Sequence, residues 1–166
     1  MWRLALIPFV LHAGLMLADE TMHVRRGLGA WERWGHPLDT LSVLLCYGLA
    51  VRLPVTASGA MMYAAAALGS SAFVTKDEWV HARDCSGAEC WLHACLFLLH
   101  PVLLGLVGAW AFADLWPGIS FAADATGRSL FGRFLAVQLG LTIVFAIWQL
   151  LFWNGPWKPS LRIARH

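Results

Sequence analysis

The chain has 166 residues, of which 59% are hydrophobic and only 13% are charged. A soluble domain usually carries about 25% charged residues, so this composition indicates an integral membrane protein, and its length fits one domain over residues 1–166. The formal net charge of +2 is small, and the basic residues are scattered along the chain. Neither feature indicates nucleic acid as a partner.

Five apolar segments are long enough to cross a bilayer, which takes about 20 residues. The first has the basic start of a signal peptide, but it runs directly into Asp19 and Glu20 without a small-residue cleavage site, so we interpret it as a retained helix. We therefore predict an all-α membrane protein with about five transmembrane helices. They cover approximately residues 2–22, 32–53, 56–75, 89–112 and 131–153.

Basic residues predict the orientation, because cytoplasmic loops carry an excess of Lys and Arg. Eight basic residues fall on one side of the predicted helices: Arg25, Arg26, Arg33, Lys76, Arg83, Lys158, Arg162 and Arg165. Four fall on the other side: Arg3, Arg52, Arg128 and Arg133. We expect the first side to face the cytoplasm of an inner membrane, with the N-terminus outside and the C-terminus inside.

A charged motif occurs twice in this apolar chain. "DETMHVR" at 19–25 matches "DEWVHAR" at 77–83, and "ERWGH" at 32–36 matches "ECWLH" at 89–93. Each copy is expected to end one helix and to open the next. The pattern therefore predicts two helix-pair repeats, about 2–53 and about 56–112, related by a pseudo-two-fold axis along the membrane normal. The segment 131–153 would be a peripheral fifth helix.

The spacing inside the motifs places acidic and histidine residues on shared helix faces, because residues three or four apart are neighbours on a helix. Both copies would deliver their side chains to the same membrane side. Charged residues could simply mark helix ends, but that does not explain recurring histidines, whereas divalent metals explain both residue types. The predicted metal ligands are Glu20, His23, Glu32, His36, Glu78, His81, Glu89 and His93.

This ligand pattern resembles that of di-iron and di-manganese carboxylate bundles, where Glu and Glu-x-x-His motifs project from facing helices. The resemblance covers only the ligands, and the Glu-x-x-x-His motifs make this site richer in histidine. Mixed carboxylate and imidazole ligands suit iron, manganese or zinc rather than calcium or magnesium. We expect two divalent ions, with iron favoured.

Further polar residues are expected around these ligands as outer partners. They are Asp19, Asp77, His12, Asp39, His100, Arg25 and Arg83. His12 and His100 could also serve a proton path or bind haem as axial ligands, although haem is the less favoured cofactor. Cys85, Cys90 and Cys95 surround the second motif, and their role stays open.

The leading hypothesis is a membrane-embedded dinuclear metal enzyme with its site at the cytoplasmic interface. Iron would support redox or oxygen chemistry on a hydrophobic small molecule, lipid-like or quinone-like, that approaches from the bilayer. Zinc would instead support a hydrolase. The alternatives are a b-type haem electron carrier and a metal transporter or sensor. The sequence does not identify catalytic residues or an oligomeric state.

Overall fold

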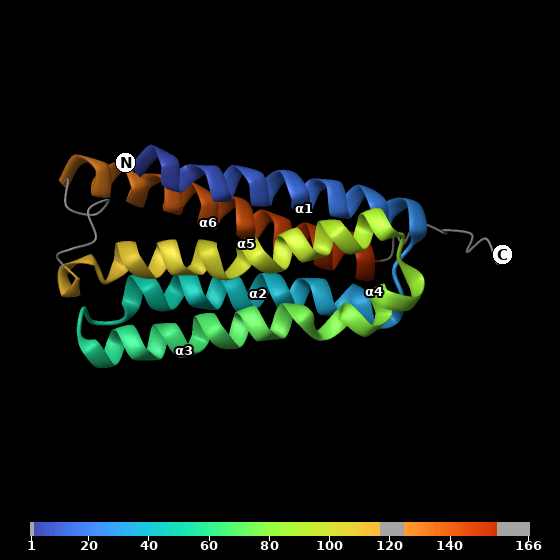
Figure 1. Cartoon of the computed structure of the whole chain (residues 1–166), viewed down its shortest axis with the longest axis horizontal. Helices are drawn as coiled ribbons and strands as arrows, with labels where there is room; N and C mark the ends of the chain where they lie inside the picture. The colour runs from blue at the N-terminus through green and yellow to red at the C-terminus, as the bar shows by residue number, and fades with distance from the viewer. Residues whose placement is uncertain (1, 117–124, 156–166) are drawn as a thin grey trace.

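The computed structural model describes residues 2–116 and 125–155, and these form helices and short connections (Figure 1). The basic residues Lys158, Arg162 and Arg165 lie outside the described residues. The helices are η1 (Trp2–Ala5), α1 (Leu6–Arg26), α2 (Ala30–Arg52), α3 (Ala57–Phe73), η2 (Val74–Asp77), α4 (Glu78–Asp84), α5 (Gly87–Ala111), η3 (Ala113–Leu115) and α6 (Ala125–Asn154). Within the described residues there is no strand, so the predicted all-α class is confirmed.

Among residues 2–116 and 125–155, four helical runs are long and apolar enough to cross a membrane, which fits a membrane protein. They are Arg3–Arg26, Ala57–Arg83, Gly87–Ala111 and Ala125–Asn154. The helix α2 has a sufficient length of 23 residues, but Glu32, His36 and Asp39 make it more polar than these four. Four of the five predicted segments are thus helices with the length and apolar composition of membrane spans.

The five long helices lie lengthwise beside one another, and consecutive helices run in opposite directions (Figure 1). Within this bundle α1 packs on α5, and α2 packs on α3, α5 and α6. One end of the bundle, which we call the site end, therefore holds the end of α1, the start of α2, α4, the start of α5 and the end of α6. Both copies of the motif lie there, while their pseudo-two-fold relation remains a prediction.

The helix α6, which covers the predicted peripheral segment 131–153, packs on α2 within the bundle. Its residues Phe131 and Leu135 belong to the buried core, where the ring of Phe131 lies 5.9 Å from that of Phe9. Near the site end, Thr40 of α2 donates a hydrogen bond of 2.7 Å to the buried Gln149 of α6. A polar amide in a membrane helix usually faces the interior of the bundle, so Gln149 is the residue in this sequence that could have indicated an interior face of α6.

The two motif copies differ in local structure. The first copy ends α1 and opens α2, as expected, but α3 ends at Phe73 and the second copy begins on η2 and the short α4. The hydroxyl of Thr75 donates to the carbonyl of Ala72 at 2.7 Å, and such local bonds compete with α-helical pairing. Lys76, on the same turn, donates to Asp39 at 2.6 Å, which holds η2 against α2.

A proline inside α2 links this helix to α6. Pro37 has no backbone N–H, so the carbonyl of Arg33 loses its intrahelical donor. The side chain of Asn154 at the end of α6 donates to that carbonyl at 3.0 Å. The proline thus frees an acceptor that fixes α6 against the start of α2.

Candidate metal centre

Two glutamates of the motifs occupy equivalent positions at the starts of α2 and α5. Glu32 and Glu89 are each the third residue of their helix, where the helix dipole and free N–H groups favour a carboxylate. Glu32 accepts from the backbone N–H of Gly29 at 3.1 Å, and the Glu89 N–H donates to Ser86 at 3.3 Å. Helix capping therefore explains the position of the Glu32 carboxylate, whereas at the start of α5 the capping side chain is that of Ser86.

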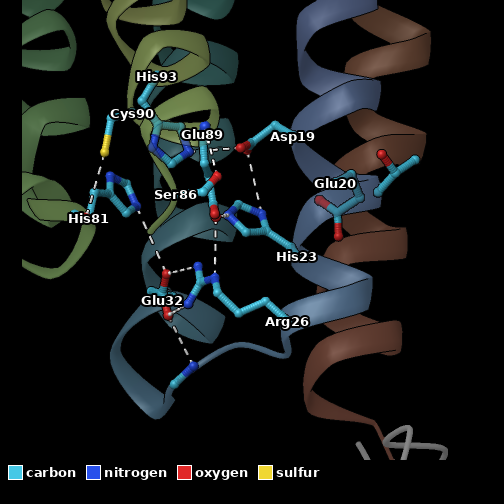
Figure 2. A network of polar contacts seen from close by, with 12 residues as sticks. Asp19, Glu20, His23, Arg26, Glu32, His81, Ser86, Glu89, Cys90 and His93 are labelled. Atoms are coloured by element: carbon cyan, nitrogen blue, oxygen red, sulfur yellow. Dashed lines mark hydrogen bonds and ion pairs between the residues drawn. The ribbon is translucent and has the colours of Figure 1, made fainter. Parts of the chain in front are cut away.

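Arg26, the last residue of α1, bridges these two glutamates (Figure 2). Its guanidinium donates to Glu32 at 2.6 and 3.2 Å and to Glu89 at 3.2 Å. Bidentate contacts of this kind are strong because a planar guanidinium matches a carboxylate. One arginine thus joins the ends of α1, α2 and α5.

A second buried group lies one turn deeper, where α1 faces α5. Asp19 and His23 are one helical turn apart on α1, and the Asp19 carboxylate lies 3.5 Å from His23 Nδ1. Asp19 also pairs with Nε2 of His93 from α5 at 2.7 Å (Figure 2). All three residues are buried, and the carboxylate therefore lies between two imidazoles.

The remaining motif histidines surround this group. The ring of His81, from α4, stacks on that of His93 with centroids 3.8 Å apart, and its Nε2 lies 3.9 Å from Glu32. The ring of His36, from α2, lies 4.7 Å from that of His23. We call the whole set the polar cluster: Asp19, His23, Arg26, Glu32, His36, His81, Glu89 and His93.

The structure does not bring Glu20 and Glu78 to the polar cluster. Glu20 is buried but points away from it (Figure 2), and it accepts from the indole N–H of Trp153 at 2.6 Å. Glu78, at the start of α4, is exposed. Adjacent helical residues do not share a face, so Asp19 rather than Glu20 faces the histidines.

The predicted outer residues lie at several levels. Asp39 forms its ion pair with Lys76, and the side chain of Asp77 lies outside the described residues. Arg25 is exposed, and exposed Arg83 lies over the ring of Trp79 at 4.9 Å.

His100 belongs to a chain of hydrogen bonds in the middle of the bundle. Ser42 donates to the carbonyl of Asp39 at 2.7 Å and lies 2.7 Å from Ser70, which lies 2.9 Å from His100 Nε2. A hydroxyl has one hydrogen, so Ser70 donates to Ser42 and Nε2 of His100 donates to Ser70. This donor count places the ring hydrogen of His100 on Nε2, so Nδ1 carries the lone pair. His12 lies on α1 and is half-buried.

The four cysteines are free thiols, and two of them border the cluster. The thiol of Cys85, in the turn between α4 and α5, lies beside Glu89. Burial, reinforced by the Glu89 carboxylate and opposed by Arg26, raises the pKa of Cys85 to about 12. It is therefore a neutral thiol at physiological pH. Cys90 contacts the carbonyl of His81 at 3.7 Å.

The polar surroundings of the buried His23 ring are incomplete. Its side chain is 0% exposed, and neither ring nitrogen has a hydrogen-bond partner; Nδ1 of His93 has none either. Buried polar atoms are nearly always satisfied, and an exception calls for an explanation. Two sets have ligand atoms within 4.8 Å of one another, Asp19–His23–His93 and His23–Glu32–His36. A metal ion would use the lone pairs that the protein leaves unpaired.

Comparison with protein-family models, with curated proteins and with solved structures finds no match to this chain. Of the residues that form the polar cluster, sequence reasoning missed the part played by Arg26. The signal was available, because Asp19, His23 and Arg26 follow one another at four and three residues and share one face of α1. The sequence analysis named Arg25 instead, which lies on another face.

Proposed function

We propose that the protein is a membrane-embedded metal enzyme whose first ion is held by Asp19, His23 and His93. The observation that carries this proposal is the buried His23, which has both ring nitrogens without hydrogen-bond partners and the Asp19 carboxylate 3.5 Å away. Leaving buried polar atoms unsatisfied costs about 1–3 kcal/mol each. Metal coordination would satisfy the ring nitrogen that binds the ion and would replace the Asp19–His93 hydrogen bond.

The proposed ligand set favours iron and redox chemistry. Two histidines and one carboxylate with open positions are the ligands of many non-haem Fe(II) oxygenases. Three protein ligands also leave coordination positions for a substrate, as in catalytic rather than structural sites. The same set suits zinc, so a zinc-dependent hydrolase is the alternative, and the identity of the bound metal distinguishes the two.

The surroundings of the site support a membrane interface and a hydrophobic substrate. Four tryptophans at the site end expose about half or more of their surface: Trp31, Trp34, Trp79 and Trp91. Tryptophans gather at membrane–water interfaces, and Lys and Arg gather on the cytoplasmic side. The proposed enzyme therefore has its site at the cytoplasmic interface of the inner membrane, where a lipid-like or quinone-like molecule can reach it.

The test is metal analysis of the protein purified in detergent and loaded anaerobically with Fe(II), Zn(II) or Mn(II). We expect one tightly bound ion per chain, and a chelator should lower the melting temperature, because a ligand at 100 times its Kd stabilises the folded state by about 2.7 kcal/mol. Asp19→Asn, His23→Gln and His93→Gln should each lose the ion. Iron-loaded protein should consume oxygen with a quinol analogue.

Matched controls separate ligand loss from unfolding. Glu78→Gln changes an exposed carboxylate of the same motif, and Glu20→Gln changes a buried one that points away from the cluster, so both should keep the ion. Wild-type protein that binds no stoichiometric metal and does not respond to chelation would refute the metal site. Stoichiometric zinc without oxygen consumption would support the hydrolase instead.

A further inference from the structure

Arg26 lies where a second cation would be expected. Its guanidinium contacts both glutamates at the helix starts, Glu32 and Glu89, and its side chain is 23% exposed. The carboxylates themselves are almost fully buried, at 2% and 5% side-chain exposure. Buried carboxylates need a paired positive charge, and here an arginine supplies it.

The side chains around the guanidinium are themselves metal ligands by type. The Glu89 oxygen that accepts from Arg26 lies 3.7 Å from His23 Nε2. The Glu32 oxygen that accepts from Arg26 lies 3.9 Å from His81 Nε2. His36 belongs to the set that brings its ligand atom within 4.8 Å of those of His23 and Glu32. The guanidinium therefore lies among two carboxylates and several imidazoles.

The charge of the polar cluster limits how many ions it can accept. Its three carboxylates, on Asp19, Glu32 and Glu89, face one guanidinium, so with neutral histidines two negative charges remain. One divalent cation balances them. A second cation close to Arg26 would be repelled, because like charges within a few ångströms of each other in a protein interior interact strongly.

The end of α1 permits Arg26 to leave. Arg26 is the last helical residue, and Gly27 follows with φ of 81°, a left-handed conformation that stops the helix. The guanidinium side chain already reaches the surface in part. It can therefore turn towards water without moving the residues of α1 that carry Asp19 and His23.

We propose that the Arg26 guanidinium occupies the site of a second divalent transition-metal ion and so acts as a placeholder for it. The ion binds through Glu32, Glu89, His36 and His81 after the guanidinium has rotated out towards water. This inference rests on the proposed function, since it adds a second ion to the Asp19–His23–His93 site. Wild-type protein then binds its first ion readily and its second only in competition with Arg26.

The experiment compares the binding of Mn(II) and Zn(II) to the wild-type protein, to Arg26→Gln and to the adjacent, exposed control Arg25→Gln. In Arg26→Gln the second ion should bind at least about tenfold more tightly than in wild type, since hydrogen bonds to charged groups are worth about 1.5–3 kcal/mol. Arg25→Gln should match wild type. Two Mn(II) ions at neighbouring positions should also give an exchange-coupled electron paramagnetic resonance spectrum, which ions scattered over the surface do not.

A measurement on the unaltered chain covers the case in which Arg26→Gln does not fold. Excess Zn(II) should increase the modification of Arg26 by phenylglyoxal, followed by mass spectrometry, while the modification of Arg25 stays constant. Equal second-ion affinities in wild type and Arg26→Gln, or an Arg26 reactivity that does not respond to Zn(II), would overturn the placeholder. If neither protein binds even one ion, the proposed function fails first. One tight ion in both, with no second, refutes only this inference.

Discussion

A glycine on α5 allows close packing between α3 and α5. Gly108 on α5 lies against the ring of Tyr63, whose hydroxyl donates to the carbonyl of Leu104 at 2.6 Å. An added Cβ at Gly108 would lie 2.5 Å from a ring carbon of Tyr63. The glycine is thus needed for close approach, because neither the ring nor its hydrogen bond can shift independently of the other.

Replacing Gly108 tests this contact at the scale of one methyl group. We expect Gly108→Ala to destabilise the protein by about 1–3 kcal/mol, the usual cost of overpacking. The control is Gly105→Ala on the same helix, where an added Cβ meets nothing within 4 Å. That change should be neutral or stabilising by up to about 1 kcal/mol, since alanine is the better helix former. Equilibrium unfolding in mixed micelles measures both, and equal effects would contradict the packing argument.

Helices α2 and α6 are joined by a consequence of proline chemistry. Because Pro37 frees the carbonyl of Arg33, Asn154 can bind it from another helix. We expect Asn154→Ala to cost about 0.5–1.5 kcal/mol, the usual net value of one hydrogen bond, because this contact is only part-buried. In a Pro37→Ala background residue 37 regains its N–H, so the same change should cost less. Unfolding of the four proteins of this double-mutant cycle checks the coupling, and strictly additive costs would show that the proline is irrelevant to the contact.

The first and last described long helices, α1 and α6, are joined by the hydrogen bond from Trp153 to Glu20. Trp153→Phe removes the N–H that Glu20 accepts from, so we expect a loss of about 1–3 kcal/mol of stability. Replacing both partners, as in Glu20→Leu with Trp153→Phe, should recover most of that loss, because no polar group then stays buried alone. Metal binding should not change in either protein. A loss of metal would place Glu20 in the site after all.

Sequence reasoning reached the helical class and most of the polar cluster because both follow from local rules. Apolar length marks the spans, and spacing of three or four residues places Asp19 and His23 on one face. Sequence reasoning could not predict the tertiary placement of single side chains. Glu20 and Glu78 occupy matched positions in the two motif copies, so periodicity did not predict that Glu20 is buried and Glu78 exposed. The packing of α6 in the bundle rests on tertiary contacts of Phe131, Gln149 and Trp153, which helical periodicity does not predict.

The sequence separation of these contacts has a consequence for synthesis. Arg26 meets Glu89 63 residues later, and Glu20 meets Trp153 133 residues later. At a synthesis rate of about 5–20 residues per second, α1 waits roughly 7–27 s for Trp153 to be made. During that interval the Glu20 carboxylate has no Trp153 indole to accept from, whereas Asp19 already has His23 on its own helix and gains His93 before Trp153 is made. An unpaired carboxylate is costly in lipid, so we expect the end of α1 to stay at the insertion machinery or at the water boundary until α6 emerges. The first long helix to be made is then the last to complete its contacts.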